Sequence, residues 1–447
     1  MRFQNALIYL HLGLLSVGLL ASPAAHALTL KEAIEDAIVH NPEFRKEVKA
    51  FRATQAQVRS AEGGYYPSID LSAGIGYEEV KQGYSGGIDN QGNGLERQEG
   101  SIKLTQNLFQ GFATQEEVRR QKYRQDSAAY KAQAAASTVA LDMATAYINL
   151  LKEKELLKLA KDSLDTHLKI HAQILKRNQA GIGNQVEVDQ AEARLALAQS
   201  NLGSEQNNYY DALAKFQRIL GRQPDNSLIK PKFKYSLPQS LDAATKIAMQ
   251  NHPTLASANA DVAAARAQYD ASGKNYYPTI NLEVEKTFNN NLSGIKGEND
   301  YMQAMLRLKY NLYNGGRDSS EVKRTSSEYM QATEVRNNTR RQVIENLRYA
   351  WNAYQYIGDQ IPYINKHIKL THETLVGYRK QFNLGRRSLL DLLNTENEYT
   401  SALRTLINNE ADELIAKYRI LAATGELLNA LSIQYSFVDA EKQYDNE

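Results

Sequence analysis

Two hydrophobic periods alternate along the chain, and the longer one predicts very long helices. After Gly111, apolar positions recur at helical spacing as far as about residue 180, with Leu150, Leu157 and Leu164 seven residues apart. No proline occurs in 68–223, and proline breaks helix interiors at a cost of about 3 kcal/mol. We therefore predict one helix of about 70 residues, or ~105 Å at 1.5 Å per residue.

A glycine break, Gly181-Ile182-Gly183, ends this helix, and a second helical pattern follows. Its apolar and small positions alternate at spacings of three and four, and the same seam returns 204 residues later: Val188, Ala191, Leu195, Ala198 and Leu202, then Leu392, Thr395, Tyr399, Ala402 and Leu406. Such spacing is typical of antiparallel coiled-coil pairs joined at glycine turns. The alternative, short helices of a globular bundle, leaves the proline-free stretch unexplained. Pro362 predicts an interruption or kink in the second long helix.

The shorter period, of two residues, predicts two β-strands in each half of the chain. The alternating apolar positions are Ile69, Leu71, Ala73, Ile75 and Tyr77; Ile102 and Leu104; Ile280, Leu282 and Val284; and Met302, Ala304, Leu306, Leu308, Tyr310 and Leu312. Membrane strands and soluble hairpins share this pattern. The pairs Tyr65-Tyr66 and Tyr276-Tyr277 stand where strands begin, and aromatic belts lie at membrane interfaces, which favours membrane strands. Segments 83–99 and 290–300, rich in Gly, Asn and Asp, are predicted as loops.

The chain contains an internal duplication. Tyr65-Tyr66-Pro67-Ser68-Ile69 recurs 211 residues later as Tyr276-Tyr277-Pro278-Thr279-Ile280, and Leu108-Phe109-Gln110-Gly111 recurs 204 residues later as Leu312-Tyr313-Asn314-Gly315. We therefore predict two repeats, 28–238 and 239–447, each with a helix, two strands and a helical hairpin, the second followed by a C-terminal tail. The fold class is mainly α with membrane β.

Four strands per chain require partner chains if the strands cross a membrane. Membrane strands need a closed barrel, and the smallest such barrels have eight strands. Two chains give eight strands, enclosing an interior filled by side chains. Three chains give twelve strands and an open lumen, so we favour a homotrimer embedded in lipid.

Residues 1–27 have the order of a signal peptide. Arg2 precedes an apolar stretch, 6–21, which is followed by the small-residue cleavage pattern Ala25-His26-Ala27. The alternative, a membrane anchor, is disfavoured because the apolar run is short and interrupted by His11. No later run reaches 18 consecutive apolar residues, so we expect the exported chain to enter a membrane only as β-strands.

Composition excludes several classes of protein. The 447 residues include no cysteine, which excludes disulfide scaffolds, zinc ribbons, iron–sulfur sites and thiol nucleophiles. The 53 basic and 51 acidic residues leave a net charge of +2, which gives no reason to expect nucleic acid as a partner.

The duplicated plan, the Tyr-Tyr-Pro strand starts and the stretch 378–394, YRKQFNLGRRSLLDLLN, resemble the TolC family of outer-membrane channel proteins, most closely its type I secretion members. The resemblance covers essentially all of the exported chain. It implies a homotrimer whose 12-stranded barrel lies in the outer membrane of a Gram-negative bacterium and continues as a helical tunnel across the periplasm. It also implies docking to an inner-membrane pump, ABC-type or proton-driven, through a periplasmic adaptor (membrane fusion) protein.

In that family the tunnel closes where the hairpins turn. The resemblance implies that five residues of this sequence occupy the positions of that gate. Glu187, Phe382 and Arg387 match positions linked by charge and hydrogen bonds in the closed state, and Phe382 lacks the hydroxyl that a Tyr would bring. Asp391 matches an acid that narrows the entrance and draws cations, while Asn394 stands where a second acid often lies. The alternative is that the acids are ordinary helix-start charges. The turns are the expected adaptor-docking residues: Gly181, Ile182, Gly183, Leu384, Gly385 and Arg386.

Two motifs that point to other chemistry are weak. Gly83-Tyr84-Ser85-Gly86-Gly87 fits the G-x-S-x-G pattern of hydrolases but lies between two strands, not on a strand-to-helix elbow. His167 and His171 are four residues apart on a helix but lack a third ligand nearby, so we favour a solvated helix face. No phosphate-binding loop, dinucleotide fingerprint or H-E-x-x-H motif occurs, so no cofactor or metal is expected.

The sequence therefore predicts the passive, gated exit duct of a tripartite export system, for proteins or small molecules, and not an enzyme. A stand-alone diffusion porin is the alternative, but porins use short periplasmic turns and would have no use for the long helices. An exported enzyme that uses Ser85 is the third possibility.

Overall fold

The computed structural model describes residues 28–80, 94–223 and 228–433, in which the same order of elements occurs twice. The first series is α1 (Leu30–His40), α2 (Pro42–Glu62), the 3-10 turn η1 (Gly63–Tyr65), β1 (Ser68–Glu78), β2 (Leu95–Gln110), α3 (Ala113–Gln179) and α4 (Gln185–Leu220). The second is α5 (Leu241–Asn251), α6 (Pro253–Ser272), η2 (Gly273–Tyr276), β3 (Thr279–Asn290), β4 (Met302–Lys309), α7 (Arg317–Asn383) and α8 (Leu389–Ala423), followed by α9 (Leu427–Ala430). The predicted signal peptide, the final tail 434–447 and Ser85 lie outside the described residues.

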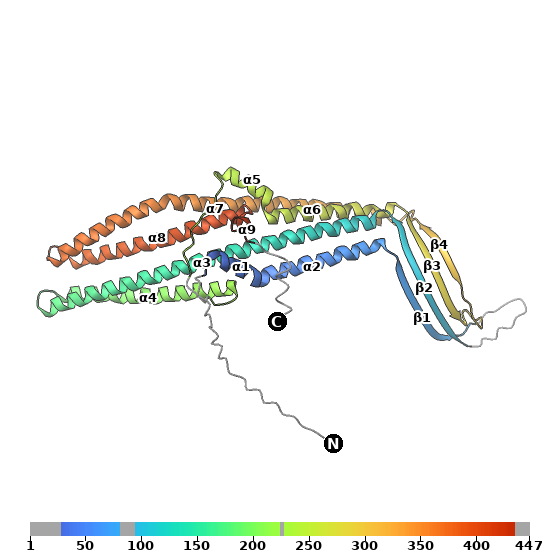
Figure 1. The fold of residues 1–447 in the computed structure, drawn as a ribbon, viewed down its shortest axis with the longest axis horizontal. Helices are drawn as coiled ribbons and strands as arrows, with labels where there is room; N and C mark the ends of the chain where they lie inside the picture. Colours follow the sequence, from blue (N-terminus) through green and yellow to red (C-terminus); the bar gives the residue numbers. More distant parts are fainter. Residues whose placement is uncertain (1–27, 81–93, 224–227, 434–447) are drawn as a thin grey trace, which may run out of the picture.

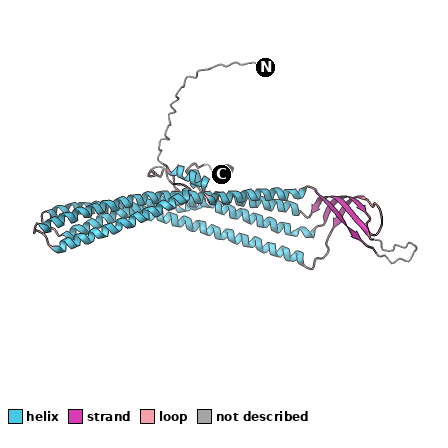
Figure 2. Cartoon of the chain, turned by 90° about the horizontal axis from the view of Figure 1, so that it is seen from below, coloured by secondary structure: helices cyan, strands magenta, loops and turns pink. Residues whose placement is uncertain are grey.

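The molecule is elongated, with the strands at one end and the two hairpin turns at the other (Figure 1). Helices α2 and α6 accompany the parts of α3 and α7 nearest the sheet, whereas α4 and α8 accompany the parts nearest the turns. The short helices α1, α5 and α9 lie midway along the length. The perpendicular view in Figure 2 shows the same division into a helical body and a small sheet.

The predicted long helices are confirmed. Helices α3 and α7 have 67 residues each, about 100 Å at 1.5 Å per residue. The expected interruption at Pro362 is wrong, because α7 runs through this residue as one helix. The proline ring presses on the carbonyl four residues earlier, which belongs to Gly358. A glycine without a side chain leaves the backbone room to adjust there, and α7 arches along its length in Figure 1.

Helix α3 is also apolar enough to be mistaken for a membrane-crossing helix. Among the described residues it is the one helix with an 18-residue window that passes on length and composition. Half of that window is buried in the fold. Its apolar character therefore reflects packing against neighbouring helices.

The main core lies midway along the molecule, where α1, the start of α2, α3, the end of α4 and the end of α8 meet. Its largest buried side chains include Phe44, Tyr147, Phe216 and Tyr418. The Tyr147 hydroxyl lies 2.7 Å from the Leu28 carbonyl oxygen and 2.8 Å from that of Ile229, and it accepts from the Ile229 N–H at 2.9 Å. One buried hydroxyl of α3 thus connects the segments that contain Leu28 and Ile229 to this helix.

The predicted coiled-coil seam is confirmed along α4 and α8. Its positions are buried at Val188, Ala191, Ala198, Leu392, Thr395 and Ala402 and half-buried at Leu195, Leu202, Tyr399 and Leu406. Both hairpins therefore pack through small and branched side chains that let the helices approach closely.

The four strands form one antiparallel sheet in the order β1-β2-β3-β4. Two strand bounds differ from the prediction. Residues 95–99, expected in a loop, begin β2, where Arg97 forms an ion pair with Glu78 across the strands at 2.7 Å. Strand β4 ends at Lys309, because the Asn311 side chain accepts from the Tyr313 N–H at 3.1 Å and turns the chain.

The sheet meets the helices through a crowded junction. Gly111 has a φ of 58°, and a Cβ there would lie 2.5 Å from the carbonyl oxygen of Lys274. The ring of Tyr277 packs edge-on against Phe109 and Phe112, with centroids 6.2 and 5.7 Å away. Only glycine fits at position 111, because it tolerates both the left-handed backbone and the close contact.

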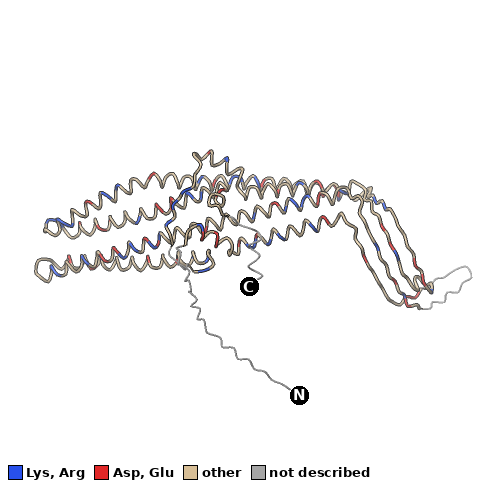
Figure 3. Tube along the Cα trace, in the orientation of Figure 1, with Lys and Arg blue, Asp and Glu red and all other residues tan. Residues whose placement is uncertain are grey.

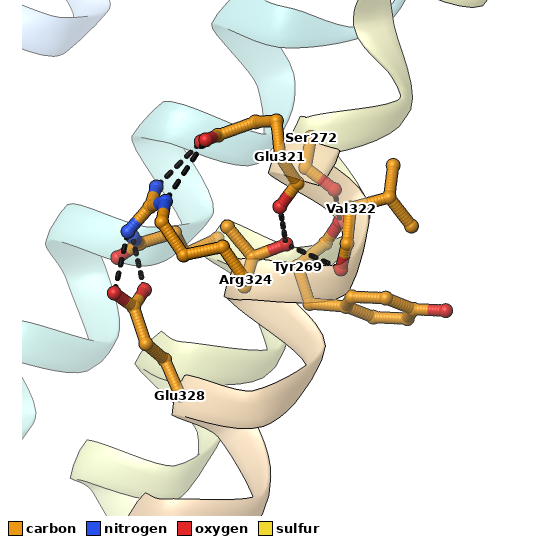
Figure 4. Close-up of polar contacts among 8 residues, drawn as sticks. Tyr269, Ser272, Glu321, Val322, Arg324 and Glu328 are labelled. Atoms are coloured by element: carbon orange, nitrogen blue, oxygen red, sulfur yellow. Dashed lines mark hydrogen bonds and ion pairs between the residues drawn. The ribbon is translucent and has the colours of Figure 1, made fainter. Parts of the chain in front are cut away.

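The start of α7 is held by a charged cluster beside α6. Arg324 lies between Glu321 and Glu328 and forms an ion pair with each, that with Glu321 at 2.5 Å (Figure 4). Gln268 of α6 donates to Glu328 at 3.2 Å. The cluster therefore connects the first turns of α7 to the neighbouring helix.

Candidate functional site: the hairpin turns and the polar face of the sheet

The two hairpin turns have the same backbone structure. Gly181 and Gly385 adopt left-handed φ angles of 73° and 72°. In the first turn the Ile182 N–H donates to the Arg177 carbonyl at 3.0 Å, and in the second the Arg386 N–H donates to the Gln381 carbonyl at 2.9 Å. These bonds satisfy carbonyl groups that a helix end leaves free. The 204-residue shift found in the sequence thus holds at the level of single hydrogen bonds.

The helix that follows each turn begins with a matched cap. The Asn184 side chain accepts from the Glu187 N–H at 2.9 Å, and the Ser388 hydroxyl accepts from the Asp391 N–H at 3.2 Å. Glu187 and Asp391 therefore occupy equivalent places in the first turns of α4 and α8. Helix dipoles favour carboxylates there, so both acids stabilise their helices whatever else they do.

Arg387 is held within its own hairpin. Its guanidinium carbon lies 3.8 Å from the centroid of the Tyr378 ring, and its Nε lies 3.4 Å from a carboxylate oxygen of Asp391. Glu187 is half-buried and has no ion pair within the described residues. A single chain therefore brings Arg387 to Asp391 and Tyr378 and does not bring it to Glu187. Tyr378 begins the stretch 378–394, but no local pattern singles it out as the partner of Arg387.

Phe382 lies inside the contact between the two hairpins. Its side chain is 3% exposed, and Arg177 of α3 stacks over its ring at 5.0 Å. It belongs to an apolar cluster with residues of both hairpins: Ile170, Ile174, Val188, Ala191, Leu375, Leu389, Leu392 and Leu393. Phe382 has no hydroxyl group to form a hydrogen bond, and burial of its ring holds the two hairpins together.

Polar contacts also cross between the hairpins near the turns. Asn394 accepts from an Nη of Arg194 at 3.1 Å, and Gln173 donates to Asn383 at 3.1 Å. The resemblance placed Asn394 at the entrance and named no partner for it. Residues from distant helices meet here only through the tertiary packing.

The tips of the turns expose large apolar side chains. Ile182 and Leu384 are 72% and 71% exposed, and Val186 and Leu390 are exposed beside them. The surrounding Gly181, Gly385 and Arg386 are exposed too, and Gly183 is half-buried. Side chains of this kind at a tip favour contact with another protein.

The sheet has one polar and one apolar face. On the polar face Lys103 and Arg307 form ion pairs with Glu283 at 3.0 and 3.3 Å, and Ser72 and Ser101 share a hydrogen bond of 2.7 Å. The charged residues along the strands are visible in Figure 3. The register places the apolar partners on the opposite face: Ile69 with Leu104, Leu71 with Ile102, Leu104 with Val284 and Leu282 with Leu306.

The four predicted interface tyrosines lie where the helices give way to the sheet. Tyr65 and Tyr66 are 51% and 72% exposed, and Tyr276 and Tyr277 are 54% and 47% exposed. Both pairs precede the first strand of their half. Their positions beside the strand starts agree with the sequence, and their place at a membrane interface stays a prediction.

The prediction that His167 lies on a solvated helix face is wrong. His167 of α3 is 5% exposed, because α4 and the opposite hairpin's α8 cover this face of α3. His171, one turn further, is half-buried. Across 28–80, 94–223 and 228–433, no group of three or more His, Cys, Asp or Glu side chains is placed to hold a metal ion.

Two long helical hairpins, with a two-faced four-stranded sheet at the end of the molecule opposite their turns, are the architecture of outer-membrane duct proteins. Residues 33–222 and 245–426 match the family model described as outer membrane efflux protein, and the chain belongs to this family. The predicted resemblance to the TolC family is thereby confirmed. The protein is an outer-membrane export duct of a Gram-negative bacterium, and the members of its family are channels.

Individual relatives agree with the family match. The chain is 24% identical over 442 residues to the outer membrane efflux protein BepC of Brucella suis biovar 1 (strain 1330), covering 96% of this chain and 93% of BepC. It is 23% identical over 428 residues to the outer membrane protein TolC of Escherichia coli (strain K12), covering 91% and 84%. The crystal structure of the Campylobacter jejuni CmeC outer membrane channel superposes with a TM-score of 0.80 at 14% identity, covering 93% and 88%, so it shares the fold.

Proposed function

We propose that three copies of this chain close one barrel and one tunnel, which form the outer-membrane exit of a tripartite export system. The main observation in support of this proposal is the pairing of the four-stranded sheet. Strands β1 and β4 each pair on one side only within the described residues, and membrane strands tolerate no free edge. With three copies the sheets close into twelve strands, the ion pairs around Glu283 line the lumen, and Ile69, Leu71 and Leu306 face lipid.

The surface of α7 supports contact between copies. Tyr349, Tyr356, Tyr363 and Leu370 recur every seven residues and are 57%, 62%, 76% and 51% exposed. A heptad stripe of this kind fits the seam of a further helix. We assign it to a neighbouring copy, because three chains must pack side by side to form a tunnel below a twelve-stranded barrel.

The interface tyrosines support a boundary between the proposed barrel and the periplasm at the level where the helices end. Tyr65, Tyr66, Tyr276 and Tyr277 are exposed in one band between the helices and the strands. Tyrosine rings with an apolar body and a polar tip suit the headgroup level of a bilayer. The helical body then extends about 100 Å away from the membrane.

The turns form the proposed gate and docking tip. Arg387, Asp391, Glu187 and Asn394 lie within the first turns of α4 and α8 or beside them. In a trimer these charged and polar groups are repeated three times around the entrance, where Glu187, which has no ion pair within the described part of its own chain, can meet Arg387 of a neighbour. Phe382 anchors the closed arrangement by burial. The exposed apolar tips receive a periplasmic adaptor, and an inner-membrane pump supplies the energy.

The resemblance of the stretch 378–394 supports a proposal for the class of cargo. It resembles type I secretion members, so we propose an unfolded protein substrate, with small toxic compounds as the second candidate. The polar face of the sheet suits either passenger, because Lys103, Glu283 and Arg307 leave no continuous apolar surface to retain one.

A cross-linking experiment tests the trimer, since the sequence has no cysteine. Leu71→Cys in β1 combined with Leu306→Cys in β4 places one thiol on each free edge strand. A flexible bis-maleimide should then give a covalent trimer on denaturing gels. Leu104→Cys combined with Val284→Cys is the matched control, because these residues are partners within one sheet and should link only inside a chain. Covalent dimers without trimers would contradict the proposal and favour an eight-stranded barrel.

Single-channel conductance in planar bilayers separates the duct from a stand-alone diffusion porin. A gated duct should show a small conductance that rises when Glu187 and Arg387 are both neutralised. A large conductance that is indifferent to these residues would favour the porin. The two 67-residue helices argue against a porin, because porins use short periplasmic turns.

A further inference from the structure

Polar contacts join the two hairpins of one chain at three distances from the tips. From the tips inward, the pairs are Gln173 with Asn383, Arg194 with Asn394, and Glu205 with Arg404. The innermost pair is an ion pair between α4 and α8. At 1.5 Å per residue, Glu205 lies about 16 Å further along α4 from the turn than Arg194 does.

These contacts differ in burial and in charge. The pair nearest the tips is exposed and neutral on both sides, and the next pair joins the half-buried Arg194 to an exposed amide. Glu205 is only 4% exposed, Arg404 is half-buried, and Asn208 also donates to Glu205 at 3.3 Å. Burial and charge therefore both increase with distance from the tips.

This gradient determines where the hairpins separate most easily. Water can replace the partner of an exposed amide at little cost, because exposed groups exchange hydrogen bonds with the solvent. A buried carboxylate that loses its cation is left as an uncompensated charge, which is strongly unfavourable. The apolar contacts around Phe382 are non-directional, so they can slide without such a penalty. Separation is therefore easiest at the tips and most costly at Glu205.

The ion pair belongs to the contact between the hairpins and is not part of the internal repeat. The 204-residue shift places Asn409 at the position equivalent to Glu205, and Ser200 at the position equivalent to Arg404. These two neutral residues cannot form an ion pair. The glycine turns and helix caps, which each hairpin needs for itself, are repeated. A pair that occurs in one direction only therefore reflects how α4 of the first hairpin meets α8 of the second.

We propose that Glu205 and Arg404 form the pivot about which the two hairpins of one chain separate when the gate opens. Their ion pair stays formed in the closed and the open state, and the parts of the hairpins between it and the tips move apart. Because a carboxylate and a guanidinium meet in a preferred geometry, the pair also holds α4 and α8 in one axial register. On closing, this register brings the apolar cluster around Phe382 together again. The inference rests on the proposed gate at the turns.

Cross-linking tests the pivot directly, because the sequence has no cysteine. The full mature protein carrying Glu187→Gln and Arg387→Gln is the starting point, since its proposed gate should be open and its conductance in planar bilayers raised. Adding Glu205→Cys with Arg404→Cys and joining the two thiols by a short bis-maleimide should leave the conductance raised.

The matched pair for comparison is Arg194→Cys with Asn394→Cys in the same starting protein. It also joins α4 to α8, but it lies nearer the tips. Its cross-link should return the conductance to the small wild-type value, because the moving parts of the hairpins are then tied together. The extent of cross-linking is measured by mass spectrometry in both cases.

The outcomes distinguish failure of the pivot from failure of the gate. If linking positions 205 and 404 abolishes the raised conductance, the ion pair separates on opening, and the pivot is overturned while the gate stands. If linking positions 194 and 394 leaves the conductance raised, the hairpins of one chain do not separate there, and the pivot is again overturned. If Glu187→Gln with Arg387→Gln does not raise the conductance at all, the proposed gate fails and the pivot fails with it.

Exchange of the two charges gives a second test in the otherwise unchanged protein. Glu205→Arg places two cations together and should raise the small closed-state conductance, because α4 and α8 lose their register. Adding Arg404→Glu should restore the small conductance, which general destabilisation by two substitutions would not do. Asp165→Arg is the control, since Asp165 pairs with Lys169 on the exposed surface of one helix, and it should leave the conductance small. An unchanged conductance in Glu205→Arg, or an intact trimer without restoration in the double variant, would overturn the pivot.

Discussion

Arg387 rests on the ring of Tyr378, with its guanidinium carbon 3.8 Å from the ring centroid, although the α7–α8 turn separates the two residues. Such a contact is worth about 0.5–1 kcal/mol at an exposed site. The same side chain reaches Asp391 in the first turn of α8. One arginine thus bridges the end of α7 and the start of α8, at the tip where the proposed gate closes.

Removing this bridge should loosen the entrance. We expect Arg387→Ser to raise the single-channel conductance of the purified protein in planar bilayers, because Tyr378 and Asp391 both lose their cation. Arg386→Ser is the matched control, since Arg386 is exposed next to it. Unchanged conductance in Arg387→Ser, or an equal rise in both variants, would contradict the assignment of Arg387 to the gate.

Charging the apolar tip should prevent adaptor docking. We expect Ile182→Asp to abolish co-purification with the adaptor and to stop export, because the 72% exposed side chain offers apolar area that a carboxylate removes. Leu168→Asp is the control, since Leu168 is 46% exposed on the same hairpin but lies on the helix shaft. The trimer and its membrane insertion should stay intact in both. Normal adaptor binding by Ile182→Asp would count against docking at the turns.

Gly111→Ala should destabilise the junction between sheet and helices. Its φ is 58°, and a methyl group on its Cα would lie 2.5 Å from the Lys274 carbonyl oxygen, which leaves no room for a Cβ. We expect a loss of about 1–3 kcal/mol, seen as a lower melting temperature. Gly63→Ala is the control, because its φ is −54° and a Cβ there would meet no atom within 4 Å. Equal melting temperatures of the two variants would refute this account of the junction.

The buried hydroxyl of Tyr147 should stabilise the middle of the molecule in a pH-dependent way. Tyr147→Phe leaves backbone groups of Leu28 and Ile229 without this partner, at a cost of about 1–3 kcal/mol. Tyr130→Phe, at a 39% exposed position, should cost little.

The pH dependence follows from the proton on that hydroxyl. Burial raises the pKa of Tyr147 to about 12, above the ordinary value of 10.0. The folded chain therefore holds the proton more tightly, and the stabilisation is present below pH 10 and lost as the pH rises through 12. Between these values the melting temperature of the wild type should fall more than that of Tyr147→Phe. Parallel curves would show that the hydroxyl does not ionise on unfolding.

Local patterns are sufficient to predict most of the elements. A proline-free stretch and a three-four seam depend on the helix itself, so the two long helices and the buried Val188 and Leu392 are predictable. Strand ends are harder, because the Asn311 side chain stops β4 by a contact that alternation does not reveal. The interruption expected at Pro362 does not occur, since one unfavourable residue does not break a helix whose neighbours stabilise it.

The sequence by itself determined the repeat, the two periods and the glycine turns, because these patterns are visible in the order of the residues alone, and its resemblance to a known family marked Glu187, Arg387 and Asp391. Only the tertiary structure decided which side chains meet. It paired Arg387 with Tyr378, buried Phe382 between the hairpins and enclosed His167 beside Arg194. Contacts such as that of Arg194 with Asn394 join residues 200 positions apart. They form because packing two hairpins together brings faces into contact that no local period specifies.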